Sequence, residues 1–149
     1  MSRQIFILAF TFFCLGNATP SVQAVEPGTR VEVQSLSATV VAEEYFPGVF
    51  IYRIDVSTTC SFAIDANENM GNFGTANSVM SVHIKDSNGN VIASDTGSGT
   101  MMSAGESRTQ TVNLFSYAST GTYTVSVQAS ITGELFLEQD FDDTAVTVP

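Results

Sequence analysis

The sequence is poor in the residues that many functions require. Among 149 residues it has no tryptophan, one histidine, two cysteines and five lysine or arginine residues. The few cations are scattered along the chain, so no basic stripe exists to neutralise nucleic-acid phosphates or anionic lipids. Fifteen aspartate and glutamate residues give a formal net charge of −10 at pH 7, which favours solubility and keeps copies apart. We therefore expect neither nucleic acid nor membrane insertion.

The same shortages argue against an enzyme. A catalytic histidine needs an orienting carboxylate and a nucleophile, and the chain has no Gly-x-Ser-x-Gly turn. The one histidine, His83, lies between Ser81 and Lys85 at an outward position of an alternating stretch, which is typical of a solvent-facing sheet residue. One histidine and a buried cysteine cannot form a zinc quartet. Paired acids can cleave sugars, but a sandwich without tryptophan lacks the usual stacking platform. We expect no catalysis and no cofactor.

The first 24 residues have the pattern of a secretory signal peptide. Arg3 supplies the positive charge, and residues 5–15 form an apolar run that is too short to span a bilayer. Small residues in SVQA (21–24) precede an expected cut before residue 25, and a cut after Ala18 is the alternative. We therefore expect one mature domain over residues 25–149, secreted, periplasmic or at the cell surface, and long enough to bury a core.

Two long stretches alternate between apolar and polar residues. In FIYRIDVSTTCSFAI (50–64), every second residue from Phe50 onwards is apolar or threonine, and the positions between include Arg53 and Asp55. In YTVSVQASI (123–131), the tyrosine, valines, alanine and isoleucine alternate with threonine, serine and glutamine. A period of two sustained over this length predicts half-buried β-strands.

The remaining chain reads as shorter strands separated by turns. The alternation changes phase between Val33 and Leu36, which predicts a bulge or a crossing between sheets. DSNGN (86–90) predicts a hairpin in which Asn88 and Gly89 both take positive φ. These patterns predict an all-β fold, a two-sheet antiparallel immunoglobulin-like sandwich of about seven strands. The shorter strands are expected at residues 31–41, 80–85, 91–94, 108–115, 134–143 and 144–148.

The second half of the chain resembles a known type of module. SAGES (103–107) followed by STGTYTVSV (119–127) resembles the later strands of bacterial immunoglobulin-like modules of the CARDB and proteinase-inhibitor-like kind. The resemblance implies that Tyr123 is a corner tyrosine with a buried ring and a hydroxyl that returns to nearby backbone. It also implies that Val125 stands where antibody domains have a disulfide cysteine. The chain lacks the antibody tryptophan and cysteine pair. Such modules bind, space or display, and no catalytic residue is carried over.

Cys60 is the one cysteine that remains after the expected cleavage, so no disulfide can form within the mature chain. It has the same parity as Ile54, Val56 and Phe62, which favours a small buried hydrophobic side chain. The alternative is an intermolecular disulfide.

A row of acids near the C-terminus is the first candidate for a cation site. ELFLEQDFDD (134–143) reads as a strand that puts Glu138, Asp140 and Asp142 on one face, with Asp143 directly after. Such neighbours lie about 6.8 Å apart. In water each pair repels by only about 0.6 kcal/mol, so an exposed row needs no cation. We expect a solvated or edge-protecting face, with a calcium site as the alternative.

A second set of oxygen ligands lies in DANEN, where Asp65, Asn67 and Asn69 have calcium-loop spacing. However, Met70 stands where an EF-hand needs its glycine, and no glutamate follows at the bidentate position. The hairpin of residues 86–90 has similar spacing, which a turn explains.

Three functions fit this sequence. The first is an exported, non-catalytic immunoglobulin-like module that binds a protein or glycan through its loops. Residues 65–77 and 96–102 are the expected binding segments, in which Met101 and Met102 are either adaptable contacts or a plug at the end of the core.

The second function is a structural subunit of an extracellular fibre or matrix. In this case the arm of residues 25–30 adds a strand to a neighbour's open edge, although no strongly apolar donor strand precedes Val31. The third is a calcium-dependent surface module.

Overall fold

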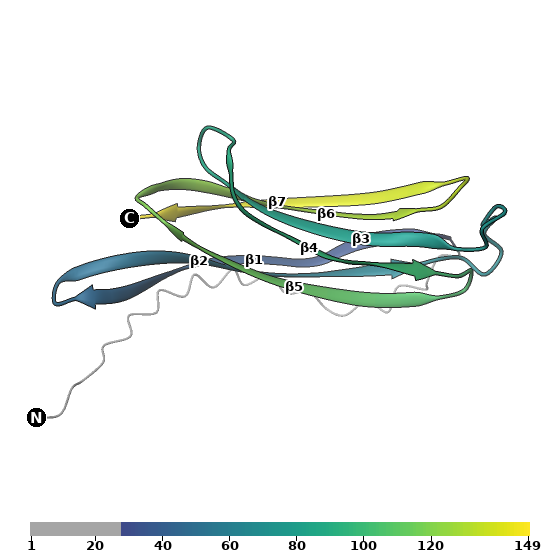
Figure 1. Ribbon diagram of the computed structural model, residues 1–149, viewed down its shortest axis with the longest axis horizontal. Coiled ribbons are helices and arrows are strands. Elements are labelled where there is room, and N and C mark those ends of the chain that lie inside the picture. The colour runs from purple at the N-terminus through teal and green to yellow at the C-terminus, as the bar shows by residue number, and fades with distance from the viewer. Residues whose placement is uncertain (1–27) are drawn as a thin grey trace, which may run out of the picture.

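The computed structural model describes residues 28–149, so the expected signal peptide (1–24) lies outside the described residues. The described chain forms seven strands in two antiparallel sheets that pack face to face (Figure 1). One sheet has the order β1-β2-β5 and the other β4-β3-β6-β7. This confirms the predicted two-sheet sandwich of about seven strands. The strands are β1 (Arg30–Phe46), β2 (Val49–Ala63), β3 (Ala76–Lys85), β4 (Val91–Met102), β5 (Ser107–Ala118), β6 (Gly121–Thr132) and β7 (Leu137–Val148).

The core lies where the alternating residues of β2, β3 and β6 meet between the sheets. On β2 the positions of even number from Ile54 to Phe62 are buried, and on β6 the positions of odd number from Tyr123 to Ile131 are buried. The predicted parity of both strands is therefore confirmed. Because each face of these strands has one chemical character, a shift of one residue would expose the whole apolar set.

The predicted phase change in β1 is a β-bulge. Val33 pairs with Cys60 and Ser35 pairs with Thr59, so Gln34 is the extra residue. Val31 and Val33 before the bulge and Leu36, Ala38 and Val40 after it all pack against the core. The bulge thus keeps one face of β1 apolar although the sequence changes phase.

The hairpin between β3 and β4 forms where predicted, but its geometry differs from the expectation. Gly89 has φ of 83°, and no residue other than glycine has positive φ within residues 28–149, so Asn88 does not share the left-handed conformation. The Asp86 carboxylate accepts hydrogen bonds from the backbone N–H groups of Asn88 and Asn90, each at 2.9 Å. Together with the side chain of Asn90, these bonds hold the pKa of Asp86 below its ordinary value. An Asx-type turn with one glycine therefore replaces the predicted pair of positive φ angles.

Two boundaries differ from the sequence analysis. Strand β4 continues to Met102, so residues 96–102 belong to a strand and do not form a loop. Its register shifts between the pairs Ser78–Thr100 and Met80–Gly97, which accommodates the glycines. At the other boundary, β7 begins at Leu137 and includes both of the strands expected after residue 134. Residues 133–136 instead form the turn between β6 and β7, closed by a hydrogen bond from Gly133 N to the carbonyl oxygen of Phe136.

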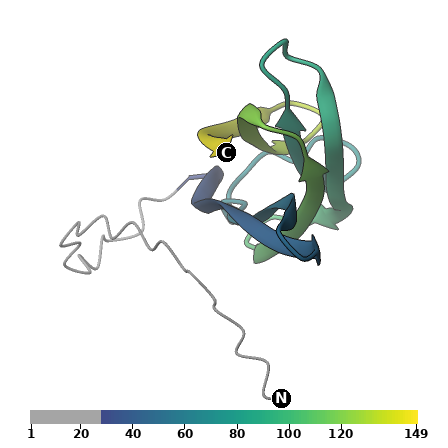
Figure 2. The ribbon, with the colours of Figure 1, turned by 90° about the vertical axis from the view of Figure 1, so that its left-hand side faces the viewer.

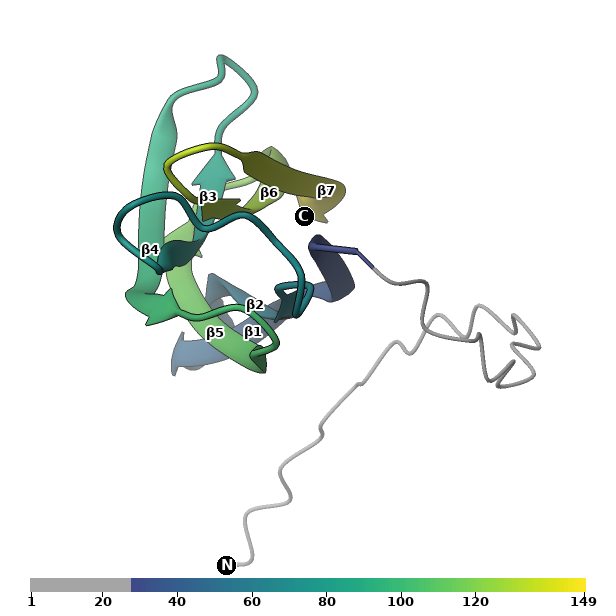
Figure 3. The same ribbon diagram turned by 90° about the vertical axis from the view of Figure 1, so that its right-hand side faces the viewer.

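The two ends of the sandwich differ. At one end, the loop between β2 and β3 crosses the space between the sheets (Figure 3) and buries Met70 against the core. At the other end, which faces the viewer in Figure 2, the β1–β2 hairpin extends beyond the end of the four-stranded sheet (Figure 1). Four large apolar side chains on this hairpin are more than half exposed: Tyr45, Phe46, Val49 and Phe50. Among the described residues there is no helix that could cross a membrane.

Candidate functional site

The acidic row lies on the face of the edge strand β7 that is turned toward the other sheet. Glu138, Asp140 and Asp142 pair with Ile131, Ala129 and Val127, whose side chains point into the core. Since directly opposed residues share a face, the three acids have inward parity. Asp140 is half-buried and its carboxylate accepts a hydrogen bond of 2.7 Å from the backbone N–H of Val33. Glu138 and Asp142 remain exposed at this open side of the sheet, and Asp143 points outward.

The second set of expected calcium ligands is used by the loop itself. The Asp65 carboxylate accepts a hydrogen bond from Asn67 N at 2.7 Å, and the Asn69 side-chain oxygen accepts one from Gly71 N at 3.1 Å. The Glu134 carboxylate binds the backbone and side-chain N–H groups of Asn72 and so ties the loop to the β6–β7 turn. Across residues 28–149, no three His, Cys, Asp or Glu side chains gather closely enough to hold a metal ion.

The N-terminal arm expected to add to a neighbour's sheet is described only from Gly28 onwards. The Thr29 hydroxyl accepts a hydrogen bond from Asp65 N at 3.2 Å and donates one to the Glu68 carboxylate. The described part of the arm is therefore attached to the chain's own loop.

Cys60 is a free, fully buried thiol near the end of β2. Burial and, to a smaller extent, the negative charge of Asp140 raise the pKa of Cys60 to about 11. The thiol is therefore protonated at neutral pH, and its side chain is closed to solvent.

Tyr123 lies at the start of β6 with 7% of its surface exposed. Its hydroxyl donates a hydrogen bond of 2.9 Å to the carbonyl oxygen of Ser119, four residues earlier. Val125, two residues further along β6, is fully buried. The tyrosine therefore fixes the path of the chain where β5 ends and β6 begins.

His83 lies on the outer face of the four-stranded sheet, opposite Ser94 on β4 and Ser126 on β6. The side chain is half-buried, and its Nδ1 atom has no hydrogen-bond partner in the described structure. Neither serine is hydrogen-bonded to it.

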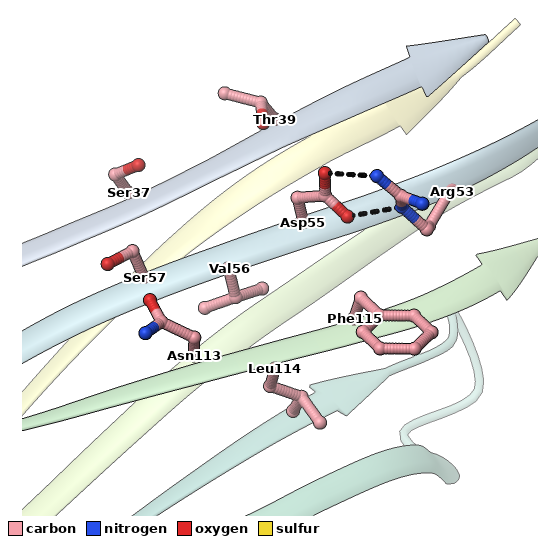
Figure 4. A pocket seen from close by; sticks show the side chains of 9 residues that line it. All are labelled: Ser37, Thr39, Arg53, Asp55, Val56, Ser57, Asn113, Leu114 and Phe115. Atoms are coloured by element: carbon pink, nitrogen blue, oxygen red, sulfur yellow. Dashed lines mark hydrogen bonds and ion pairs between the residues drawn. The ribbon is translucent and has the colours of Figure 1, made fainter. Parts of the chain in front are cut away.

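The outer face of the three-stranded sheet carries charged, polar and aromatic side chains. A shallow hollow of about 410 Å³ lies there. Strand pairing arranges its outward residues in two neighbouring rows across β1, β2 and β5 (Figure 4). We call the outer face of this sheet the β2–β5 face. The two rows at the hollow are Thr39, Asp55 and Phe115, and Ser37, Ser57 and Asn113.

A charged network fixes the β2–β5 face. Arg53 Nε and Nη2 donate to the two carboxylate oxygens of Asp55 at 2.6 and 2.9 Å, and Nη1 donates to Glu43 at 2.7 Å. The hydrogen bond with Asp55 and the charges of Asp55 and Glu43 raise the pKa of Arg53 above its ordinary value. Because a bidentate pair holds both side chains in one geometry, the Asp55 carboxylate is oriented before any ligand arrives.

Two aromatic side chains stand beside this network. Phe115 is 63% exposed and Tyr117 is 55% exposed, and both point outward from β5. The Arg53 guanidinium carbon lies 5.6 Å from the centre of the Phe115 ring, and the Tyr117 hydroxyl donates to Glu43 at 3.3 Å. These contacts restrain both rings while leaving much of each open to solvent.

This combination suits a ligand that is polar at its edges and apolar on one face. The Asp55 carboxylate accepts hydrogen bonds, and the Asn113 amide and the Ser57 hydroxyl both donate and accept them. The open ring of Phe115 offers a flat apolar surface.

The sequence analysis identified the outward positions of β2 but did not assign them a function. A signal was present in residues 108–117, where Phe115 and Tyr117 have the parity opposite to the buried Val112 and to Leu114. Two aromatic residues on the outward parity of a strand indicate a contact surface. The cross-strand position of Arg53 and Asp55 beside them requires the register, which the sequence does not contain.

No protein-family model and no curated protein sequence matches the chain. The chain is similar in structure to the C-terminal domain of Wzt, with 15% identity, a TM-score of 0.44, and coverage of 83% of this chain and 79% of that one. It is also similar to a Northeast Structural Genomics Consortium target, with 14% identity, a TM-score of 0.42, and coverage of 85% and 91%. For the putative ApaA protein from Bordetella pertussis the values are 15%, 0.39, 83% and 98%.

Proposed function

We propose that this chain is an exported, non-catalytic immunoglobulin-like module that binds a glycan on the β2–β5 face. The sequence analysis assigned binding to the loops. We assign it to the sheet face, because residues 96–102 lie within β4 and the loop of residues 65–77 uses its polar side chains to hold itself together.

One observation carries the proposal: a carboxylate held in place by a guanidinium lies directly opposite an exposed aromatic ring on the neighbouring strand. Asp55 and Phe115 are cross-strand partners on the outer face, and Arg53 contacts both. A sugar ring has hydroxyl groups around its edge and C–H groups on its faces. It can therefore donate to Asp55 while its face rests on Phe115.

A protein partner is supported less well by this surface. Protein interfaces gain most of their free energy from a few desolvated side chains in pockets. The hollow on the β2–β5 face is shallow, and most of its outward residues are hydroxyl, amide or charged groups. Such a surface offers many hydrogen bonds and one apolar platform, which matches a sugar better than a hydrophobic anchor.

Retention on insoluble polysaccharides tests the proposal. The protein is incubated with cellulose, chitin, xylan, mannan and β-1,3-glucan, and the bound fraction is measured for the wild type, Phe115→Ala and Phe141→Ala. Phe141 is the matched control, because it is 60% exposed on the outer face of the other sheet.

We expect retention on at least one polysaccharide, a loss of at least tenfold in affinity for Phe115→Ala, and no change for Phe141→Ala. Failure of the wild type to bind any of the five, or an equal loss in both variants, would contradict the proposal.

A further inference from the structure

The β2–β5 face repeats one arrangement in two successive positions along β5. Phe115 lies across from Asp55, and Tyr117 lies across from Arg53. Residues two apart on a strand share a face and lie about 6.8 Å apart. Each ring therefore has a group beside it that can form a hydrogen bond with a ligand. The two pairs form neighbouring contact positions for a ligand made of repeating units.

The surface continues as a polar track beyond these two positions. Earlier in β5, Asn113 and Thr111 are exposed on the same face, across from Ser57 and Thr59. The Thr59 and Thr111 hydroxyls lie 3.0 Å apart and bridge the two strands. A ligand that extends past the rings in this direction would meet hydroxyl and amide groups.

Within residues 28–149, no loop lines the hollow. All nine residues that line it belong to β1, β2 or β5, and none comes from a loop (Figure 4). A site that recognises the end of a polymeric ligand needs a wall that stops the polymer. An open sheet face accepts a segment from the middle of such a polymer equally well.

The charge of the β2–β5 face limits which polymeric ligands it can bind. The one cation of the network, Arg53, already binds the carboxylates of both Asp55 and Glu43, so the three groups carry a net charge of −1. A sulfate or carboxylate on a sugar would approach two carboxylates without a free cation to offset them, and like charges at such distances repel.

We propose that the ligand is a linear, uncharged polysaccharide, recognised along its interior with successive sugar units on Phe115 and Tyr117. This inference rests on the proposed function and adds the class of glycan and the direction in which it lies, which is along β5.

Calorimetric titration with linear oligosaccharides tests this inference. The probes contain one to six units each from the cellulose, chitin, xylan, mannan and β-1,3-glucan series, and carboxymethylated oligosaccharides serve as charged counterparts. The variants are Phe115→Ala, Tyr117→Ala and Asp55→Asn, with Phe141→Ala as the control and circular dichroism as the check on folding.

We expect affinity in at least one uncharged series to rise at least tenfold from one unit to three or four units and then to level off. Tyr117→Ala should remove most of this rise while leaving the affinity for a single unit unchanged. Phe115→Ala and Asp55→Asn should weaken probes of every length. The carboxymethylated counterpart should bind at least tenfold more weakly than the uncharged chain.

The possible failures can be told apart. Affinity that does not depend on length, or equal affinity for the charged chain, would overturn the inference while leaving glycan binding intact. Absence of binding to every series, by protein that is folded, would overturn the inference and the proposed function together.

Discussion

The carboxylate of Asp140 on β7 accepts a hydrogen bond of 2.7 Å from the backbone N–H of Val33 on β1, and so joins the edges of the two sheets. Val33 precedes the bulge at Gln34, where the pairing of β1 with β2 is interrupted. A buried N–H without a partner is costly, and an inward charge also keeps an edge strand from pairing with another chain. The acidic residue thus provides an acceptor for a backbone group at the edge of β1.

Replacing Asp140 by alanine should therefore lower the free energy of unfolding by about 1–3 kcal/mol, because Val33 N–H loses its partner. Asp142→Ala is the control, since Asp142 is exposed and makes no hydrogen bond across the seam between the sheets. Its effect should stay within about 0.5 kcal/mol. Urea denaturation measures both. Equal effects would show that the hydrogen bond to Val33 contributes nothing to stability.

Calcium should not stabilise the fold specifically. Asp140 already binds a backbone N–H, and the loop acids are used within their own turns. A site with a dissociation constant of ~0.1 mM, saturated at ~10 mM calcium, would add ~2.7 kcal/mol. That corresponds to a rise of roughly 8 °C in melting temperature for a domain of this size. We expect 10 mM calcium chloride to raise the melting temperature no more than sodium chloride of equal ionic strength. A larger rise that disappears in Asp140→Asn/Asp142→Asn would reinstate the cation site.

Cys60 should make stability depend on pH in the alkaline range. The pKa of Cys60 is raised by burial from 9.0 to about 11 in the folded chain. Between pH 9 and 11 the unfolded chain loses the thiol proton and the folded chain keeps it, so stability is full below pH 9 and falls as pH rises to 11. Cys60→Ala should lose this component, which denaturation curves of both proteins at pH 8 and pH 10.5 measure.

The Cys60 thiol should also resist iodoacetamide in buffer and react fully in denaturant. A disulfide-linked dimer in fresh, folded protein would contradict burial.

The parity of β6 predicts opposite outcomes for two neighbouring residues. Val125 is fully buried, so Val125→Asp puts an unpaired charge into the core and should prevent folding. Thr124 points outward across from Lys85, so Thr124→Asp should change stability by less than about 0.5 kcal/mol. Circular dichroism and thermal melting compare the two variants. If Thr124→Asp were as damaging as Val125→Asp, the assigned faces of β6 would be wrong.

The strands could be predicted where every second residue follows one chemical rule. This holds for residues 50–64 and 123–131, whose buried faces the structure confirms. It fails at residues 96–102, because glycine and serine carry no alternation, and strand formation there depends on pairing with β3. It also fails at residues 134–136, which form a turn although Leu135 and Phe136 suit a strand.

The candidate site was harder to predict than the fold, because it depends on register. Arg53 and Asp55 are visible as outward residues of one strand, but their neighbour Phe115 lies 60 residues further along the sequence. In the same way, the inward direction of Asp140 follows from pairing with Ala129, whereas its partner Val33 is known only once β1 is seen beside β7. Alternation identifies the faces of a strand, and it does not identify which strands adjoin.

The order of strands has a consequence for folding kinetics. The hairpins β1–β2, β3–β4 and β6–β7 join neighbours in the chain, whereas β5 pairs with β2 and β3 pairs with β6 across long intervening segments. The chain leaves the four-stranded sheet after β4, adds β5 to the other sheet, and returns with β6. The entropy of closing these long loops is lost before the distant contacts form, so we expect folding in milliseconds to seconds, with the local hairpins forming ahead of the pairing between them.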